Sequence, residues 1–190
     1  MDQPLLFPPN EKWESIESFI GASGNLPLSA PQRLILTGGG TLAVALHTLL
    51  TTAVHIEVIR QDLVEANPNL VRFLVLKESE KGLSREVWIL SKNNEKRVYA
   101  SSFLPINGLD PSLHGALISR KHSIGDLIET MKLPTLRDQI GFGTVRSKLL
   151  SRDFNSPPDS PLWYRHFRLS SPLHLRASIY EVFSPLLFEI

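Results

Sequence analysis

One acidic residue interrupts an apolar segment near the C-terminus, where its type and position could support acid–base chemistry. Glu181 lies in the segment ASIYEVFSPLLF, whose β-branched and aromatic residues are typical of a strand. Alternate residues of a strand face the same side, so Glu181 shares a face with Ala177, Ile179 and Phe183. Because this is the more apolar face, we expect the carboxyl group of Glu181 to point into the protein.

Two arginines occupy comparable positions in other strand-like segments. Arg85 alternates with Val87, and Arg165 alternates with Phe167. A buried charge is costly unless it is paired or bound to a ligand. Two interpretations therefore stay open. One is a structural Glu–Arg pair inside the sheet. The other is a pocket in which guanidinium groups bind an anion while Glu181, kept protonated by apolar surroundings, donates a proton.

The composition excludes several classes of protein. The chain has 190 residues, a formal net charge of +1 and no cysteine. The small charge argues against a nucleic-acid or membrane surface, and the missing cysteines exclude disulfides, thiol catalysis and cysteine-ligated metals. Neither a membrane-spanning segment nor a signal peptide is evident. We expect a single cytoplasmic domain over residues 1–190, with residues 1–32, interrupted by prolines, forming an irregular N-terminal segment.

Metal and phosphate motifs do not explain the chain. His55 and Glu57 share a strand face, but His47 precedes them on a helical segment, so the spacing does not match a metal site. The triple glycine Gly38–Gly40 lacks the lysine of a phosphate-binding loop and is better interpreted as a turn, with Thr41 as the N-cap of the next helix. No G-x-S-x-G motif occurs. We expect no metal and no cofactor.

The periodicity favours an α+β fold with an antiparallel sheet, because hairpin-like neighbours outnumber alternating βαβ units. Strands are predicted at residues 54–63, 85–91, 97–104, 162–170 and 172–183. Helices are predicted at residues 11–20, 42–50, 111–119, 123–131 and 136–140. The polar, proline-containing segment 143–161 is predicted to be a mobile loop.

Four segments form a recognisable series: TGGGTLAVAL with VHIEVIRQDLV, then SREVWILSKNNEKRVYASSFLP, then HSIGDLI, and finally LWYRHFRLSSPLHLRASIYEVFSPLL. In this order and spacing, from about Arg33 to Phe188, the chain resembles the chorismate lyase (chorismate pyruvate-lyase) family. The resemblance implies an antiparallel sheet of about six strands, with helical flaps covering an internal site. It also implies cofactor-free conversion of chorismate to 4-hydroxybenzoate and pyruvate, for ubiquinone or, in photosynthetic lineages, plastoquinone.

The resemblance also implies roles for individual residues. Arg85 matches the arginine that binds the ring carboxylate, and Glu181 matches the acid that meets the 4-oxygen of the product. Arg165 would either neutralise the enolpyruvyl carboxylate or orient Glu181. Flap backbone contacts fall on Ile124, before Gly125, and on Gly40, before Thr41. We therefore expect Glu181 and Arg85 to be catalytic, and the substrate-binding residues to be Arg85, Gly40, Thr41, Ile124, Gly125 and Arg165.

The chain departs from the family at Gly39-Gly40, where members commonly carry Ser followed by Leu or Met. A glycine still offers its backbone N–H, so a backbone contact is retained. Two alternatives stay open: a related reaction on another enolpyruvyl or cyclohexadiene acid, and a non-catalytic module that binds aromatic carboxylates on the same fold.

The second alternative is similar to the effector-binding halves of transcription regulators. Those carry a helix-turn-helix before the sensor, a pattern that the proline-broken stretch before Arg33 does not match. An inward acid favours an enzyme, because a carboxylate binder needs cations alone. The predicted partners are chorismate and 4-hydroxybenzoate, with no nucleic acid and no membrane insertion; the oligomeric state is left open.

Overall fold

A computed structural model describes residues 16–22, 28–120 and 122–188 of the chain. Within these residues, six strands form one antiparallel sheet in the order β1-β2-β3-β6-β5-β4. The strands are β1 (Val54–Glu65), β2 (Lys81–Ser91), β3 (Lys96–Pro105), β4 (Leu136–Val145), β5 (Leu162–Ser171) and β6 (Leu175–Phe183). The predicted fold class is confirmed: α+β, with an antiparallel sheet of six strands.

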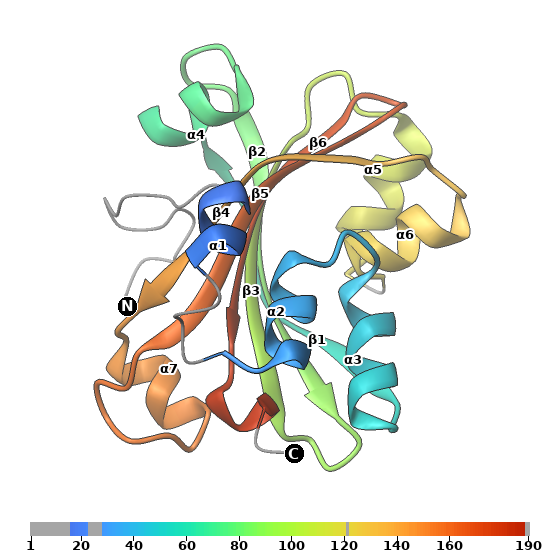
Figure 1. Cartoon of the computed structure of the whole chain (residues 1–190). Helices are drawn as coiled ribbons and strands as arrows, with labels where there is room; N and C mark the ends of the chain where they lie inside the picture. Colours follow the sequence, from blue (N-terminus) through green and yellow to red (C-terminus); the bar gives the residue numbers. More distant parts are fainter. Residues whose placement is uncertain (1–15, 23–27, 121, 189–190) are drawn as a thin grey trace.

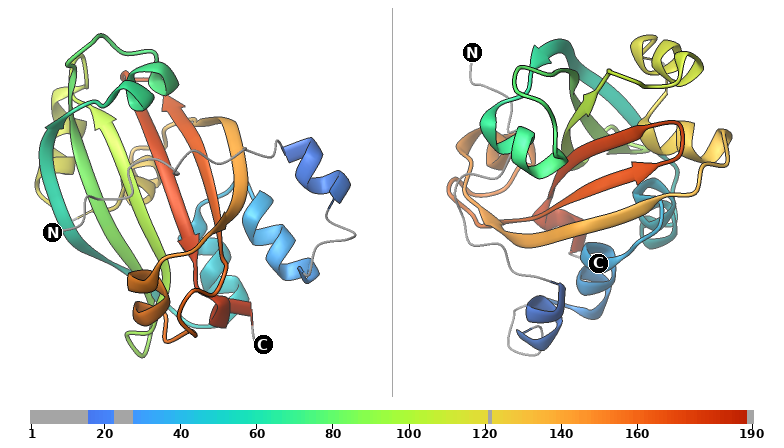
Figure 2. Two further views of the ribbon diagram at one scale, coloured as in Figure 1. Left: turned by 90° about the vertical axis from the view of Figure 1, so that its left-hand side faces the viewer. Right: turned by 90° about the horizontal axis from the view of Figure 1, so that it is seen from above.

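Helices cover both faces of this sheet, as Figure 1 and the two rotated views of Figure 2 show. One face, which we call the inner face, carries α2 (Ala30–Thr37), α3 (Leu42–Leu50), α5 (Pro111–Ile118) and α6 (Ile124–Thr130). The opposite, outer face carries α4 (Pro68–Leu74) and α7 (Lys148–Asp153). The remaining elements are α1 (Ile16–Ala22), which contacts β4, and a terminal 3₁₀ helix η1 (Pro185–Phe188).

Local sequence explains where the inner-face helices begin. The hydroxyl of Ser29 accepts a hydrogen bond from the backbone N–H of Gln32, whose side chain accepts one from the Ser29 N–H, a capping box that starts α2. Ser123 and Asp126 form the same reciprocal pair at the start of α6, with distances of 2.9 and 3.0 Å. The residue at which each of these two helices starts is therefore set by its own capping residues. Both helices lie beside the candidate site.

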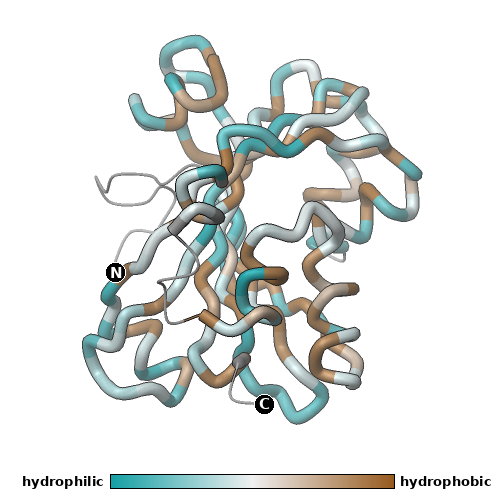
Figure 3. Tube along the Cα trace, in the orientation of Figure 1, coloured by the Kyte–Doolittle hydropathy of each residue, from teal (hydrophilic) through white to brown (hydrophobic). Residues whose placement is uncertain are grey.

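Two apolar clusters pack on the inner face. The first joins α1, α2 and α3 to the sheet through residues that include Phe19, Leu36, Leu46, Phe142 and Phe183. The second joins α5 and α6 to the sheet through residues that include Leu104, Leu113, Leu117, Phe167 and Leu175. In Figure 3 the hydrophobic residues of α3 contrast with the hydrophilic turn between β2 and β3. The inner face thus has two separate anchoring regions, with a space between them.

A β-bulge in β4 changes which side chains this strand places on the inner face. Asp138 pairs with Arg168, and the next pair joins Gly141 to His166, so three steps on β4 match two on β5. Gln139 adopts a left-handed backbone with φ 49°. The bulge shifts the alternation of side chains by one residue. Arg137 and Phe142 consequently face the same side of the sheet.

The prediction of a helix at residues 136–140 is wrong, because these residues belong to β4. The mobile loop predicted at residues 143–161 is also wrong, because β4 continues to Val145 and α7 follows. Buried Leu150 and Phe154 anchor α7 on the outer face, and the Ser147 hydroxyl caps it by accepting from the Leu150 N–H. Packing of two apolar side chains thus outweighed the polar composition of the segment.

The described part of the N-terminal segment 1–32 contains helices. The helix α1, Ile16–Ala22, overlaps the helix predicted at residues 11–20, and α2 starts at Ala30. Of the helix predicted at residues 11–20, residues 11–15 lie outside the described ranges. The extent of the domain over residues 1–190 stays a prediction. None of the helices in the described ranges combines the length and apolar composition needed to cross a membrane.

We predict that Gly82 cannot accept a side chain. A Cβ there would lie 2.3 Å from Cζ of Phe103 and 2.6 Å from the Leu104 carbonyl oxygen. Because overpacking typically costs 1–3 kcal/mol, Gly82→Ala should lower the free energy of unfolding in urea by about 1–3 kcal/mol. Gly115→Ala is the matched control: it lies in α5 with nothing within 4 Å, and it should stabilise by about 0.5–1 kcal/mol. Equal effects of both variants would contradict this view of the packing.

We also predict that His166 makes stability pH-dependent. Its ring is fully buried, stacks on Phe73 and hydrogen-bonds the Ser178 hydroxyl, and burial lowers its pKa from 6.5 to about 3. Between these values the unfolded state binds a proton that the folded state does not, so stability falls as the pH drops through this window. The slope contributed by one group is up to about 1.4 kcal/mol per pH unit.

Denaturation at several pH values between about 6.5 and 4 tests this. His166→Gln should flatten the pH dependence of the unfolding free energy in that window. His174→Gln, which changes an exposed histidine in the β5–β6 turn, should leave it as in the wild type. A His166→Gln variant with the wild-type slope would remove His166 as the cause.

Candidate active site

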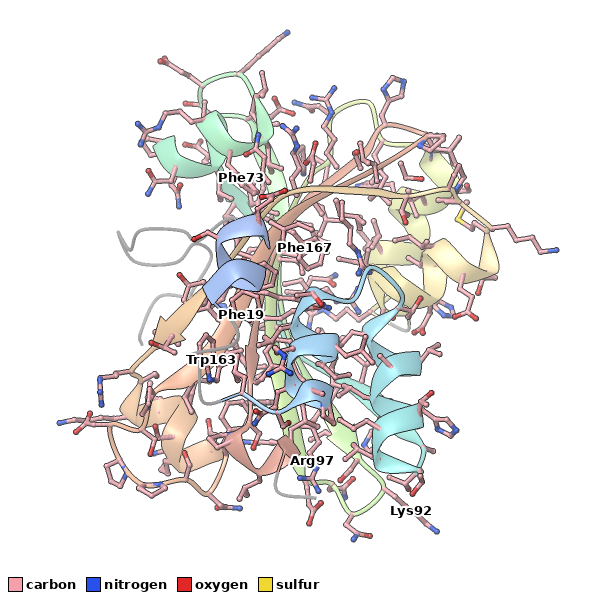
Figure 4. The ribbon with its side chains drawn as sticks, in the orientation of Figure 1. Phe19, Phe73, Lys92, Arg97, Trp163 and Phe167 are labelled. Atoms are coloured by element: carbon pink, nitrogen blue, oxygen red, sulfur yellow. The ribbon has the colours of Figure 1, made fainter. Side chains whose placement is uncertain are left out.

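A cavity of about 230 Å³ lies between the two apolar clusters of the inner face. The sheet supplies its floor, and the segments Gly39–Ala43 and Ser123–Gly125 supply its cover. Apolar side chains make up much of its wall, among them Phe167 of the inner face, which is labelled in Figure 4. The site is therefore a covered, mainly apolar chamber in which a few polar groups can fix a small ligand.

The two covering segments contact each other. Thr41 precedes α3 and Gly125 lies in the first turn of α6; a Cβ added to Gly125 would be 3.4 Å from Cγ2 of Thr41. The first N–H groups of a helix have no acceptor within the helix, and the Thr41 side chain does not cap those of α3. Because Thr41, Leu42 and Ala43 line the cavity, the start of α3 brings unused donors and a positive dipole end to it.

Glu181 forms a buried ion pair with Arg165. Nε of Arg165 donates to Oε2 of Glu181, and the two residues are 2% and 7% exposed. Nη1 of Arg165 also donates to the carbonyl oxygens of Ile35, Leu36 and Gly38, at 2.9, 3.2 and 3.1 Å. Arg165 thus binds the end of α2 as well as Glu181. Of the pair, Glu181 lines the cavity, whereas Arg165 lies behind it.

Arg85 offers a buried cation with unused donors. Its side chain lines the cavity and is 2% exposed. Nη2 donates to the carbonyl oxygen of His122 at 2.6 Å, while Nε and Nη1 are buried without a hydrogen-bond partner in the described part of the chain. Burial lowers the pKa of Arg85, Asp126 raises it and Arg120 lowers it further. A guanidinium nonetheless stays charged at neutral pH, so an anion in the cavity would satisfy it.

Arg137 is a second cation of the cavity that the sequence analysis missed. Its guanidinium carbon lies 5.0 Å from the centroid of Phe167, and Nη1 reaches the Gly38 carbonyl at 3.4 Å. Nε is buried, again without a partner among the described residues. Burial lowers the pKa of Arg137, the charge of Glu181 raises it and Arg165 lowers it. The signal that could have found this residue is the β-branched and aromatic content of residues 140–145, which favours a strand over the predicted helix.

The sheet register sets the spacing between Arg85 and Glu181. Arg85 of β2 lies opposite Ser102 of β3, and Glu181 of β6 lies opposite Ala100, two residues away on β3. With strands about 4.8 Å apart and a rise of about 3.4 Å per residue, the Cα atoms of Arg85 and Glu181 are about 12 Å apart on one face. Because Ala100 and Ser102 are small, the floor between the two charged side chains leaves space for a ring.

The structure therefore brings most of the predicted site residues together. The cavity is lined by Gly40, Thr41, Arg85, Ile124, Gly125 and Glu181. Arg165 contacts Glu181 but does not line the cavity. Within the described ranges, no three His, Asp or Glu side chains gather in a way that could hold a metal ion. The catalytic and binding roles of these residues stay predictions.

Comparison with known protein families identifies the chain's relatives. The model of the family described as chorismate pyruvate-lyase Rv2949c-like matches residues 36–190. The chain belongs to this family. The resemblance to chorismate lyases expected from the sequence is thereby confirmed. No curated protein sequence matches the chain.

Solved structures share the fold of this family member. PhnF from Mycobacterium smegmatis has a TM-score of 0.63 and 11% identity, covering 80% of this chain and 67% of that chain. The effector domain of PhnF has a TM-score of 0.60 and 10% identity, covering 78% and 90%. A GntR-family transcriptional regulator from Bacillus cereus has a TM-score of 0.56 and 13% identity, covering 72% and 95%. At such low identity the likeness concerns the fold alone.

We predict that the ion pair behind the cavity is strongly coupled. Arg165→Met would leave Glu181 buried without its cation, and breaking a buried pair in this way costs about 3–5 kcal/mol of unfolding free energy. The double variant Arg165→Met/Glu181→Leu should recover part of this loss because no uncompensated charge remains. Thermal or urea denaturation of both variants measures the difference. A double variant at least as unstable as Arg165→Met would show that the carbonyl contacts of Arg165, not its ion pair, dominate.

Proposed function

We propose that the protein is a chorismate lyase, an enzyme that eliminates pyruvate from chorismate to give 4-hydroxybenzoate without a cofactor. The observation that carries the proposal is a covered apolar cavity with a buried guanidinium, Arg85, that keeps two donors unused among the described residues, and a carboxylate, Glu181, on the same face. Membership of the chorismate pyruvate-lyase family supports it. The product would serve ubiquinone or plastoquinone biosynthesis.

Arg85 would bind the ring carboxylate of chorismate. Its unused donors match a carboxylate, and its burial excludes competing water. The backbones of Gly40 and Ile124, on the two covering segments, would add donors around the same group. Thr41 and Gly125 would close the cover over the bound ring. The ring would then extend across Ala100 and Ser102 toward Glu181.

The reaction needs little more than correct orientation. In chorismate the enolpyruvyl ether is on C3 and the hydroxyl on C4. The C3–O bond breaks while the hydrogen on C4 moves to the methylene carbon of the enolpyruvyl group, through a six-membered arrangement. The ring becomes aromatic and pyruvate leaves as the keto acid, so no external proton or oxidant is required. A site that holds the side chain over the C4 hydrogen would supply most of the acceleration by orientation.

Glu181 would accept a hydrogen bond from the 4-hydroxyl. The sequence analysis expected this residue to donate a proton, but its contact with the Arg165 guanidinium favours an acceptor. A carboxylate beside the 4-oxygen raises electron density on the ring as the C4–H bond weakens. It also fixes the position of the ring opposite Arg85. Arg165 would act through Glu181, as a positioning residue.

Incubation of the purified protein with chorismate tests the proposal, with 4-hydroxybenzoate followed by ultraviolet absorbance and pyruvate by a coupled assay. We expect both products in equal amounts. Binding of chorismate without products would overturn the lyase proposal in favour of a binding module, a role in keeping with the structural similarity to the effector domain of PhnF. Products other than these two would indicate a related reaction on the same ligand class.

Two variants test the assigned roles. Arg85→Ala should raise the KM for chorismate by about 10- to 100-fold, the worth of a hydrogen bond to a charged group. Glu181→Gln should lower kcat by a similar factor, about 10- to 100-fold, and retain 4-hydroxybenzoate binding. Arg176→Met, which changes an exposed arginine on β6, is the control and should behave as the wild type. A wild-type KM for Arg85→Ala would place the carboxylate site elsewhere, and a wild-type kcat for Glu181→Gln would remove Glu181 from the chemistry.

A further inference from the structure

We propose that Arg137 binds the second carboxylate of the substrate and makes the site selective for dicarboxylates over monocarboxylates. This inference deepens the proposed function and rests on it. The sequence analysis offered Arg165 for this task, but Arg165 stands behind Glu181, outside the lining of the cavity. Arg137 is the cation that the cavity wall presents beside Glu181.

The hydrogen bonds of the two arginines separate their roles. Arg165 makes an ion pair with Glu181 through Nε and donates through Nη1 to three carbonyl oxygens at the end of α2; its Nη2 is buried without a partner among the described residues. Arg137 makes one contact to a protein oxygen, the Gly38 carbonyl, at the long distance of 3.4 Å. Its Nε has no partner within the described residues, and its guanidinium rests over the face of Phe167. Arg137 is therefore positioned mainly by packing, and its buried Nε is available to a ligand.

The charges of the site call for a dianion. Glu181 is balanced by Arg165. Arg85 and Arg137 then leave two positive charges in the wall of one apolar cavity. An uncompensated charge in such surroundings is unfavourable, and a ligand with two carboxylates removes both. A monocarboxylate such as 4-hydroxybenzoate removes one.

The geometry of the substrate places its second carboxylate on the side of Arg137. With the ring carboxylate on Arg85 and the 4-hydroxyl on Glu181, the enolpyruvyl group extends from C3, the carbon next to the hydroxyl. Its carboxylate therefore lies near Glu181. Arg137 and the Arg165–Glu181 pair meet at the same ring: the guanidinium carbons of Arg137 and Arg165 lie 5.0 and 5.5 Å from the centroid of Phe167, and Arg137, Phe167 and Glu181 all line the cavity. Binding there would hold the enolpyruvyl chain against the face of Phe167 while the hydrogen transfers.

A comparison of two probes, chorismate and 4-hydroxybenzoate, tests the inference. Chorismate carries two carboxylates and 4-hydroxybenzoate carries one. In Arg137→Met the KM for chorismate should rise by about 10- to 100-fold, whereas the dissociation constant of 4-hydroxybenzoate, measured by calorimetry, should change less than about threefold. Arg137→Lys keeps the charge and should recover part of the affinity for chorismate. Arg85→Ala should weaken both ligands, and Arg176→Met should weaken neither.

The outcomes distinguish this inference from the proposed function. Retained binding of 4-hydroxybenzoate shows that a variant is folded. Equal weakening of both ligands in Arg137→Met, or no weakening of either, overturns the role of Arg137. If the wild-type protein binds chorismate without forming products, the lyase proposal fails, and the dissociation constants of chorismate replace KM in the same comparison. If the wild type does not bind chorismate, both proposals fall.

Discussion

The buried contact between Arg165 and Glu181 is the interaction on which the rest of the site depends. It allows a carboxylate to remain on an apolar face, where an unpaired charge would be costly. The same arginine also binds the C-terminal end of α2, because Nη1 donates to two carbonyl oxygens of the helix, those of Ile35 and Leu36, and to that of Gly38 just after it. The segment Gly39–Ala43, which follows directly, is thereby placed over the cavity. One side chain thus contacts both the buried carboxylate of Glu181 and the segment that leads into the cover of the cavity.

Much of this arrangement can be predicted from strand alternation, and the rest shows where alternation fails. The faces of β2, β5 and β6 follow the period of two, so Arg85, Glu181 and Phe167 could be assigned to one side of the sheet before any coordinates. Arg137 could not be assigned in this way, because a bulge interrupts the period and the segment was interpreted as a helix. The helix α7 was missed for another reason. Its polar composition is typical of a loop, and the packing of its buried side chains on the sheet is not visible in the local sequence.

This chain shares its fold with GntR-family regulators of known structure. On its inner face, two apolar clusters pack the helices against the sheet and leave a cavity between them. A covered apolar chamber with a few polar groups suits a small ligand, and the fold alone does not decide whether chemistry follows. In this chain the buried acid is the feature that simple recognition of an anion does not require.

The extra residue in β4 decides the electrical character of the chamber. Asp138 follows Arg137 immediately and, on the outer face, makes an ion pair with Arg168. If β4 had no bulge, residues 138, 140 and 142 would share one face of the sheet. Phe142 faces inward, so Asp138 rather than Arg137 would then face the cavity. A single irregularity of the backbone therefore determines whether this wall attracts anions or repels them.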